Sequence, residues 1–266
     1  MSAAVLLLAA LVFSSCSWAE DSKDQAPSFS SDSIVNSANG SPASLTPNGL
    51  ATVYGKNLAY VTAAVSLTDV GAGTLPTRLG SVRVTVGIWI APLLYVSPTQ
   101  INFVIPVGLT AGQYKLTVER EATSTQAEIT LLEAAPGLFV VDNGKLAATH
   151  ADGKLITTDS AAKPGEIIVV YGAGLGRTDP RQLDGVIPRV AASILRMDSL
   201  RILLDEQPLP TVSILYAGIT PGYPGLYQIN IRLPETIGKK DPELRVLMAD
   251  QMSQRSLILQ VAGANP

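Results

Sequence analysis

The chain has 266 residues, of which 47% are hydrophobic and 15% are charged, which excludes an intrinsically disordered protein and leaves ample apolar material for packed cores. The formal net charge is −3 and the Lys and Arg residues are scattered. No basic stripe is therefore available to follow a phosphate backbone, and nucleic acid is not expected as a partner. The 18 Pro and 22 Gly, against four Phe and two Trp, are typical of many short strands joined by turns. The composition predicts an all-β protein.

Residues 1–19 have the pattern of a secretory signal peptide. An apolar run of eleven residues, from Ala3 to Phe13, is too short to span a bilayer and is followed by small residues. Ser17 and Ala19 supply the small side chains at the two recognition positions, which predicts export with cleavage after Ala19. No Lys or Arg precedes the run, so an N-terminal helix of a soluble protein is the alternative.

The only cysteine of the chain, Cys16, lies within this segment. The preceding Phe13-Ser14-Ser15 loosely resembles a bacterial lipobox, so lipidation of Cys16, and with it attachment to a membrane, is the alternative to secretion. Cleavage after Ala19 would instead leave the mature chain without a thiol for a disulfide or for nucleophilic chemistry. Residues 20–33, which begin with Glu20-Asp21, are expected to form a flexible leader.

An internal repeat organises the rest of the chain. Residues 47–58 align with residues 164–175, with Pro, Tyr, Gly and Leu matching in position, and residues 100–106 align with residues 228–234. Each half also carries two alternating segments that predict a hairpin, and two further strands after the second motif. The hairpins are expected over 81–86 with 91–96 and over 200–204 with 212–217, and the later strands over 113–119, 127–132, 244–248 and 257–261.

Repeats of about 100 residues with many short strands fit immunoglobulin-like β-sandwiches better than solenoids or propellers. We therefore predict two tandem sandwiches, over residues 34–134 and 164–266. The linker between them, residues 135–163, is expected to contain a small hairpin because Asp142-Asn143-Gly144 and Asp152-Gly153 are turn signals.

Six short motifs in a fixed order carry a family resemblance. They are Val35-Asn36-Ser37-Ala38, Tyr54-Gly55-Lys56-Asn57-Leu58, Leu75-Pro76-Thr77-Arg78-Leu79-Gly80, Tyr95-Val96-Ser97-Pro98-Thr99-Gln100-Ile101-Asn102, Ala135-Pro136-Gly137-Leu138-Phe139 and Gly225-Leu226-Tyr227-Gln228-Ile229-Asn230. Together they resemble an uncharacterised family of bacterial exported proteins with tandem C-terminal domains of the IPT/TIG type, an immunoglobulin-like fold. The resemblance covers nearly everything after residue 33 and implies extracellular placement, with no catalytic residues to carry over. Almost nothing precedes the module here, so a standalone role and a truncated gene are both open.

The segment Gly172-Ala173-Gly174-Leu175-Gly176 follows an apolar strand, as a dinucleotide-binding loop does. The third glycine of that motif would have to stand at position 177, which is Arg177, and no helix pattern follows. In the repeat Gly174 aligns with Asn57, and Gly and Asn are the residues that most readily adopt the left-handed conformation. A tight turn after each strand is therefore expected, and no nucleotide cofactor.

Other chemistry has little support in the sequence. His150 is the only histidine and no Gly-x-Ser-x-Gly pattern is present, which argues against a Ser-His-Asp hydrolase. A single His without a mature Cys also argues against zinc. Asp142, Asn143 and Asp152 lack the spacing of a calcium loop and are expected to form turns. We predict no catalytic residue, no metal site and no cofactor.

Each half carries an amide pair on a strand, Gln100 with Asn102 and Gln228 with Asn230. Because the amides alternate with aliphatic residues, each pair faces away from the aliphatic side of its strand. The pairs form either a polar binding face or hydrogen-bond partners for neighbouring loops. The second interpretation is favoured because both halves contain the pair.

The clearest difference between the halves is the tip of the first predicted hairpin. Ile88, Trp89 and Ile90 stand there, whereas the second half has the polar segment Asp205-Glu206-Gln207-Pro208. Exposed aromatic side chains with apolar neighbours often mark contact sites for proteins or sugar rings, so this tip is the leading candidate for ligand binding. The alternative is that the tip packs on the second sandwich or on the leader. Tyr223, in a loop between two Pro-Gly pairs, is a second candidate, with packing as its alternative.

These features predict an exported, non-catalytic protein, secreted or at the cell surface, that binds an extracellular protein or polysaccharide through the loops at the sandwich ends. The alternative function is a structural spacer of the cell envelope, which predicts a rigid joint between the sandwiches. Fold alone does not decide between them, because sandwiches serve both roles.

Overall fold

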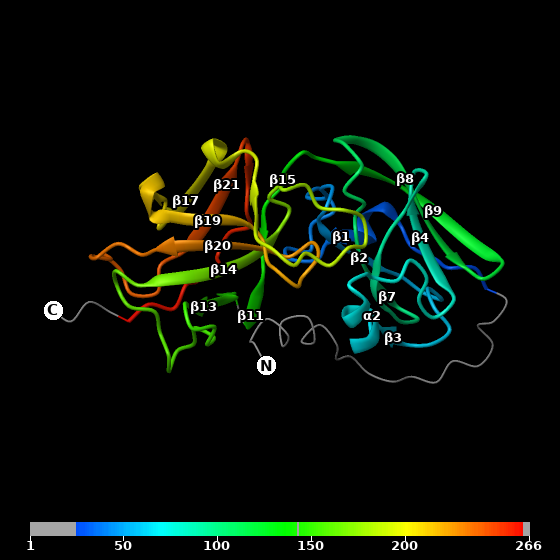
Figure 1. Cartoon of the computed structure of the whole chain (residues 1–266), viewed down its shortest axis with the longest axis horizontal. Helices are drawn as coiled ribbons and strands as arrows, with labels where there is room; N and C mark the ends of the chain where they lie inside the picture. The colour runs from blue at the N-terminus through cyan, green and yellow to red at the C-terminus, as the bar shows by residue number, and fades with distance from the viewer. Residues whose placement is uncertain (1–24, 143, 263–266) are drawn as a thin grey trace.

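The computed structural model describes residues 25–142 and 144–262, so the expected signal peptide and Cys16 lie outside the described residues. The all-β prediction is confirmed: two immunoglobulin-like β-sandwiches follow one another along the chain and lie side by side (Figure 1). Within the described ranges, no helix has the length and apolar character needed to cross a membrane.

The first sandwich consists of two antiparallel sheets. One sheet has the strand order β1 (Ile34–Asn36), β2 (Leu50–Tyr54), β7 (Gln100–Val104), β6 (Leu93–Val96), β3 (Ala63–Ala64). The other has the order β5 (Trp89–Ile90), β4 (Val82–Val86), β8 (Gly112–Arg120), β9 (Thr123–Leu131). A 3-10 helix, η1 (Ser31–Ser33), and a short helix, α2 (Leu67–Ala72), complete this unit.

The second sandwich repeats this plan. Its larger sheet has the order β10 (Gly137–Leu138), β14 (Ile167–Ala173), β20 (Tyr227–Arg232), β19 (Ile214–Ile219), β16 (Ala192–Ile194), β15 (Thr178–Asp179), with β13 (Ala148–His150) also paired to β14. The opposing sheet has the order β18 (Gln207–Pro208), β17 (Leu200–Leu204), β21 (Leu244–Met248), β22 (Gln251–Met252). Two 3-10 helices, η2 (Met197–Ser199) and η3 (Thr211–Ser213), lie in its connections.

In each half, the two motifs of the repeat form neighbouring strands. β2 pairs with β7 so that Tyr54 lies opposite Gln100, and β14 pairs with β20 so that Tyr171 lies opposite Gln228. Each half therefore builds its central strand pair from the two aligned motifs in the same register. The repeat in sequence corresponds to a structural repeat.

Alternating apolar side chains fill both cores. Every second residue of β4 is buried, and β17 buries Leu200, Ile202 and Leu204 in the same way. This is the period of two expected for a strand with one face on a core. Each such aliphatic side chain contributes about 1.5–3 kcal/mol when it is fully buried. The two cores form separate clusters, with Phe103 in the first and Tyr227 in the second.

The predicted hairpins are wrong in their second strands. β4 pairs with the two-residue strand β5 and β17 with the two-residue strand β18, whereas β6 and β19 lie in the opposing sheets. Proline explains the break in both halves. Pro92 follows β5, and Pro210 follows β18. Proline has no N–H to extend a ladder, so the chain crosses to the other sheet there.

The predicted linker contains the expected hairpin, formed by β11 (Val140–Asp142) and β12 (Lys145–Leu146). On either side of this hairpin, β10 and β13 both pair with β14 and belong to the larger sheet of the second sandwich, while β11 and β12 form a two-stranded sheet of their own. The domain limits of 34–134 and 164–266 stay a prediction.

The glycine-rich segment at the end of β14 lies against residues 135–137, which connect the two sandwiches. Gly174 and Asn57 both have a positive φ, of 82° and 56°, which confirms the predicted left-handed turns. The connecting chain crosses the glycines at close range: Ala135 donates its N–H to the Gly174 carbonyl at 2.8 Å. A Cβ on Gly172 would lie 2.6 Å from the Gly137 carbonyl oxygen, and one on Gly174 would overlap the Ala135 carbonyl. The glycines therefore allow backbone to lie on backbone where the two sandwiches join.

A third apolar cluster closes the joint between the sandwiches. Leu50 and Val104 from the first sandwich pack in one buried group with Tyr171, Ala173 and Leu226 from the second. Asn48 also donates from Nδ2 to the Tyr227 hydroxyl at 3.1 Å. Burial raises the pKa of the Tyr227 phenol above its usual range. The joint is a packed interface.

The described part of the expected leader, residues 25–33, lies on the first sandwich. Ser28 forms a β-bridge with Lys56, and the Pro27 carbonyl accepts a hydrogen bond from the Thr125 hydroxyl. Arg120, a fully buried residue at the end of β8, donates to the Gln25 carbonyl in the same segment. Polar contacts therefore attach this segment to the sandwich, and the sequence did not predict these contacts.

Candidate functional site

The tip of the β4–β5 hairpin is a tight two-residue loop. Val86 pairs with Trp89, so Gly87 and Ile88 form the turn, and Gly87 has a φ of 59°. A glycine with positive φ at the first turn position is typical of a type II′ hairpin turn. Gly87 also donates its N–H to the Lys115 carbonyl of β8 at 2.8 Å, which fixes the tip to the sheet.

Apolar side chains are exposed at this tip, as predicted. Ile88 is 92% exposed and Trp89 is 42% exposed, with Ile90 similar to Trp89. One part of the indole rests on Gly108, where an added Cβ would lie 2.6 Å from the ring atom Cη2. Trp89 therefore packs on a loop of its own sandwich. The ring is held in one place with part of its surface open to solvent.

A loop of the second sandwich reaches the first sandwich close to this tip. We call residues 183–187 the clasp. The Leu75 N–H donates to the Gly185 carbonyl at 2.7 Å, and the Val107 N–H donates to Asp184 Oδ1 at 2.6 Å. Ile187 donates its N–H to the Gly73 carbonyl at 2.9 Å and places its side chain in the interdomain cluster. Sequence reasoning missed the clasp because each contact joins residues far apart in the chain.

Tyr223 lies in a different environment from the tip. Its ring packs, partly buried, against the interdomain cluster that contains Leu226 and Tyr171. Burial, with a smaller effect of the neighbouring Tyr171, raises the pKa of Tyr223. The structure thus places this candidate among packing residues of the joint.

The two amide pairs bond within their own strands. Gln100 donates from Nε2 to Asn102 Oδ1 at 2.8 Å, and Gln228 donates to Asn230 Oδ1 at 3.0 Å. The Thr52 hydroxyl adds a hydrogen bond to Asn102 at 3.1 Å. The expected partners in neighbouring loops are therefore replaced by side chains of the same sheet. The hydrogen bond from Gln to Asn is repeated in both halves.

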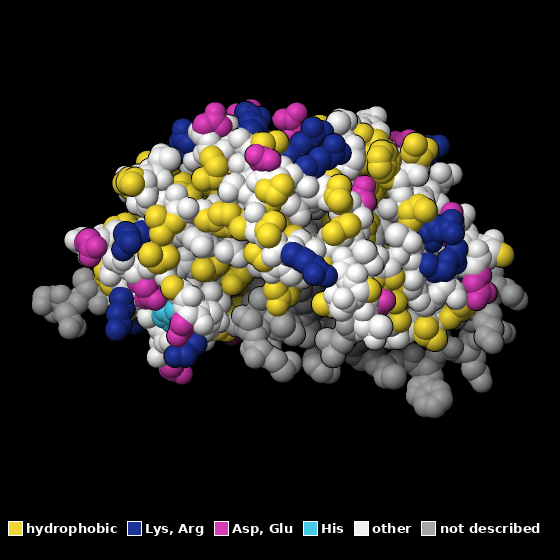
Figure 2. Space-filling model, viewed as in Figure 1, with side chains coloured by type: hydrophobic (Ala, Val, Ile, Leu, Met, Phe, Trp, Pro, Cys, Tyr) yellow, Lys and Arg dark blue, Asp and Glu magenta, His cyan; other side chains and the backbone are white. Residues whose placement is uncertain are grey.

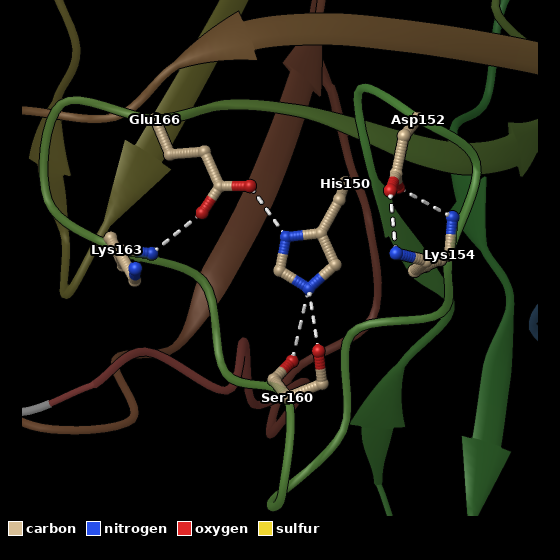
Figure 3. Close-up of polar contacts among 6 residues, drawn as sticks. All are labelled: His150, Asp152, Lys154, Ser160, Lys163 and Glu166. Carbon is tan, nitrogen blue, oxygen red and sulfur yellow. Dashed lines mark hydrogen bonds and ion pairs between the residues drawn. The ribbon is translucent and has the colours of Figure 1, made fainter.

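The single histidine lies between a carboxylate and a serine (Figure 3). His150, at the end of β13, has Nδ1 at 2.5 Å from Glu166 Oε1 and Nε2 at 3.1 Å from both the Ser160 hydroxyl and the Ser160 carbonyl. The order of serine, histidine and acid is that of a hydrolase triad. Whether His150 can act as a base depends on which of its two ring nitrogens carry a proton.

Both imidazole nitrogens face acceptors. The Glu166 carboxylate and the Ser160 carbonyl oxygen only accept hydrogen bonds, an arrangement that favours a proton on both ring nitrogens. The hydrogen bond from Glu166 raises the pKa of His150, partly opposed by burial, and the Ser160 carbonyl and the charges of Glu166 and Asp152 add to the rise. A general base would need a free lone pair at Nε2. The Ser160 N–H, moreover, donates to Thr157, so it does not face a bound oxyanion. This group ties the loop 151–165 to the sheet.

This tie predicts that stability falls as the pH rises. A histidine whose pKa is raised in the folded state stabilises the protein below its ordinary pKa of about 6.5, and the stabilisation is lost as the pH passes through the raised value. The free energy of unfolding, measured by urea titration, is expected to fall across this window in the native protein and to stay flat in His150→Gln. Because the chain has no other histidine, an equal fall in His150→Gln would contradict this assignment.

The surface has a cleft beside the histidine and a smaller pocket between the sandwiches. A cleft of about 1010 Å³ opens beside His150, and its lining holds four acidic and four basic side chains, so it favours neither sign of ligand charge: Asp152, Asp159, Asp241, Glu166, His150, Lys154, Lys163 and Lys240. A smaller pocket of about 320 Å³ lies between the sandwiches, with Leu175 and Met248 in its wall and an Arg196–Glu133 ion pair of 3.5 Å in its lining. Among the described residues, no group of three or more His, Cys, Asp or Glu side chains is placed to hold a metal ion.

On the face shown in Figure 2, Lys and Arg lie in separate groups and form no continuous stripe.

No protein-family model matches the chain, and no curated protein matches it. Solved structures match at low identity. A Bacteroides ovatus protein, SGBP-B of a mixed-linkage glucan utilisation locus, in complex with a mixed-linkage heptasaccharide, is 10% identical over 83% of this chain and 43% of that chain, with a TM-score of 0.33. The BSP domain of a biofilm associated protein is 10% identical over 85% of this chain and 31% of that chain, with a TM-score of 0.29. Domains 5-6 of the S-layer protein SbsC are 12% identical over 90% of this chain and 100% of that chain, with a TM-score of 0.26.

The chain spans less than half the length of the first two of these structures. At these identities and TM-scores the likeness identifies no family, and the resemblance to IPT/TIG domains stays a prediction. What the chain binds has to be argued from its own residues.

Proposed function

We propose that this protein is an exported, non-catalytic binding module of the bacterial cell surface that recognises a polysaccharide through the tip of the β4–β5 hairpin. The observation that carries the proposal is Trp89, an aromatic side chain that is 42% exposed at a turn tied to the sheet. A polar residue at the tip would avoid this exposed aromatic surface, and the second sandwich has Asp205 and Glu206 at the corresponding turn. The exposed indole therefore has a use outside the fold.

A polysaccharide fits this tip for two reasons. The indole rests on the Gly108 backbone, so its orientation is set before a ligand arrives and little side-chain entropy is lost on binding. A flat apolar ring of fixed orientation also matches the C–H face of a pyranose, while the hydroxyl groups around the sugar remain in water. Ile88 and Ile90 extend the apolar surface on either side of the ring.

The binding assay that tests this proposal compares Trp89→Ala with Tyr54→Ala. Tyr54, at the end of β2, is 44% exposed and serves as an aromatic control in the same sandwich but in the other sheet. Calorimetric titration of polysaccharides selected on a glycan array is expected to show affinity reduced roughly tenfold or more in Trp89→Ala and unchanged in Tyr54→Ala. Both variants should keep thermal unfolding within about 1 kcal/mol of the native protein.

Three results would contradict the proposal. They are equal losses in the two variants, binding that does not depend on Trp89, and binding to an extracellular protein in place of any polysaccharide. A Trp89→Ala protein that unfolds much earlier would make the indole a packing residue.

A rigid spacer of the cell envelope is the second candidate function, favoured by the joint. The clasp, the interdomain cluster and the glycine crossing connect the sandwiches at several points, as a spacer that transmits a fixed direction requires. A spacer has no use for an exposed tip, so loss of function in Trp89→Ala separates the two roles.

Export belongs to the same proposal and has its own test. Intact mass of the protein purified from the envelope is expected to show cleavage after Ala19. Addition of lipid at Cys16 would instead identify an anchored lipoprotein, and residues 1–19 still attached in a cytosolic fraction would contradict export.

A further inference from the structure

One edge strand of the fold differs from all the others. A sandwich has two edges per sheet, and unpaired edges invite pairing with other chains, which most proteins prevent by keeping edge strands short, charged or bulged. In the part of the chain that the structure describes, the other edge strands have two or three residues each: β1, β3, β5, β10, β11, β12, β13, β15, β18 and β22. The exception is β9, with nine residues.

β9 lacks the short length, the bulge and the Pro or Lys residues that usually protect an edge strand. It pairs with β8 over nine consecutive positions without a register shift, whereas β6 with β7 and β19 with β20 each contain one. Its sequence, TSTQAEITL, contains no Pro, no Lys and a single charge, Glu128. The described residues form no backbone hydrogen bond to its free side, although residues 27–33 lie beside the strand, where the Thr125 hydroxyl donates to the Pro27 carbonyl and η1 contacts β9. Figure 1 shows β9 at the outer rim of the first sandwich, on the side away from the second.

The outward side chains of β9 are complementary to those of a second β9 strand. Ser124, Gln126, Glu128 and Thr130 are exposed on one face. In an antiparallel pair of two β9 strands centred on Ala127, Gln126 lies opposite Glu128 twice and Ser124 lies opposite Thr130 twice. Amide–carboxylate and hydroxyl pairs across strands are favourable, and no like charges meet. A pair shifted by one position, centred on Glu128, would place the two carboxylates opposite each other.

We propose that β9 is a self-association site at which a second copy of this chain pairs antiparallel about Ala127, joining two four-stranded sheets into one continuous sheet. Such an isologous contact closes on itself, so it gives a dimer and not a fibre. The second sandwich provides an internal comparison, because its corresponding edge strand β22 has only two residues. Each dimer would present two copies of the hairpin tip.

The test uses opposite charges at position 126 in the full chain. Gln126→Glu places Glu opposite Glu128 at both symmetric positions, and Gln126→Lys places Lys there. Sedimentation equilibrium is expected to show a monomer–dimer equilibrium in the native protein. The dissociation constant should rise roughly tenfold in Gln126→Glu and fall or stay equal in Gln126→Lys. Added salt should reduce the difference between the two variants.

The double variant Gln126→Glu/Glu128→Lys restores opposite charges and is expected to recover the dimer. Residue 126 is exposed, so thermal unfolding of the monomers should be the same for every variant. A native protein that stays monomeric at all concentrations would overturn the proposal, as would a dimer that responds equally to Glu and Lys at position 126. Binding of polysaccharide by the monomer is a separate readout, so this site and the hairpin tip can fail independently.

Discussion

Replacing Arg120 with alanine is expected to lower the free energy of unfolding by about 3–4 kcal/mol, which corresponds to a fall in Tm of roughly 6–16 °C. The guanidinium is fully buried and lies 4.0 Å from the centre of the Tyr60 ring. It donates to the Asn57 carbonyl at 2.8 Å and to the Gln25 carbonyl. Alanine would leave a cavity and take the donor away from both carbonyl groups.

The second sandwich provides the control for this prediction. Arg120 pairs with Val82, the first residue of β4, and Met248 pairs in the same way with Leu200, the first residue of β17. Met248 is buried, so one half of the protein fills this position with an uncharged side chain. Arg120→Met keeps most of the volume but loses the hydrogen bonds and the contact of the charged group with the Tyr60 ring, and a cost of about 1–2 kcal/mol is expected in urea unfolding. Equal losses for Ala and Met would show that the polar contacts of the guanidinium, and not its packing volume, make Arg120 important.

The parts of the fold that were predictable depend on short-range patterns. The alternation of β4, the turn at Gly174 and the exposed position of Trp89 each follow from a few neighbouring residues. The internal repeat added longer-range information, because two motifs that recur in the same order are expected to pair, as Tyr54 does opposite Gln100. These patterns were sufficient for the class of fold and for the position of the tip.

The unpredicted parts depend on which distant segments meet. An alternating segment such as 93–96 has an inner and an outer face in either sheet of a sandwich, so its pattern did not reveal that it leaves the hairpin at Pro92. His150 and Glu166 meet across a loop, and Asp184 meets Val107 across the joint. Arg120 stands in a charged turn in the sequence and is buried only because residues 25–28 cross over it.

The glycine crossing at the joint leads to the other large expected effect, for Gly174→Ala. Gly174 has a φ of 82°, which an L residue adopts at a cost of about 1–2 kcal/mol. The added methyl would also meet the Ala135 carbonyl oxygen, which is backbone and fixed by its own hydrogen-bonded neighbours, so one chain has to move. We expect a loss of at least about 3 kcal/mol in the free energy of unfolding.

Gly222→Ala separates the two causes of that loss. Gly222 has a similar φ of 87°, but nothing lies within 4 Å of a Cβ built there, so this variant carries the backbone strain alone and should lose about 1 kcal/mol. Thermal unfolding of both variants measures the difference, and small-angle scattering shows whether Gly174→Ala also opens the angle between the sandwiches. If the two variants lose the same stability, the connector yields to the methyl group without cost, and the joint is a hinge and not a fixed crossing. A larger loss for Gly174→Ala with a wider scattering envelope would show that contact between the two backbones holds the sandwiches in one orientation, which both a spacer and a two-site binder require.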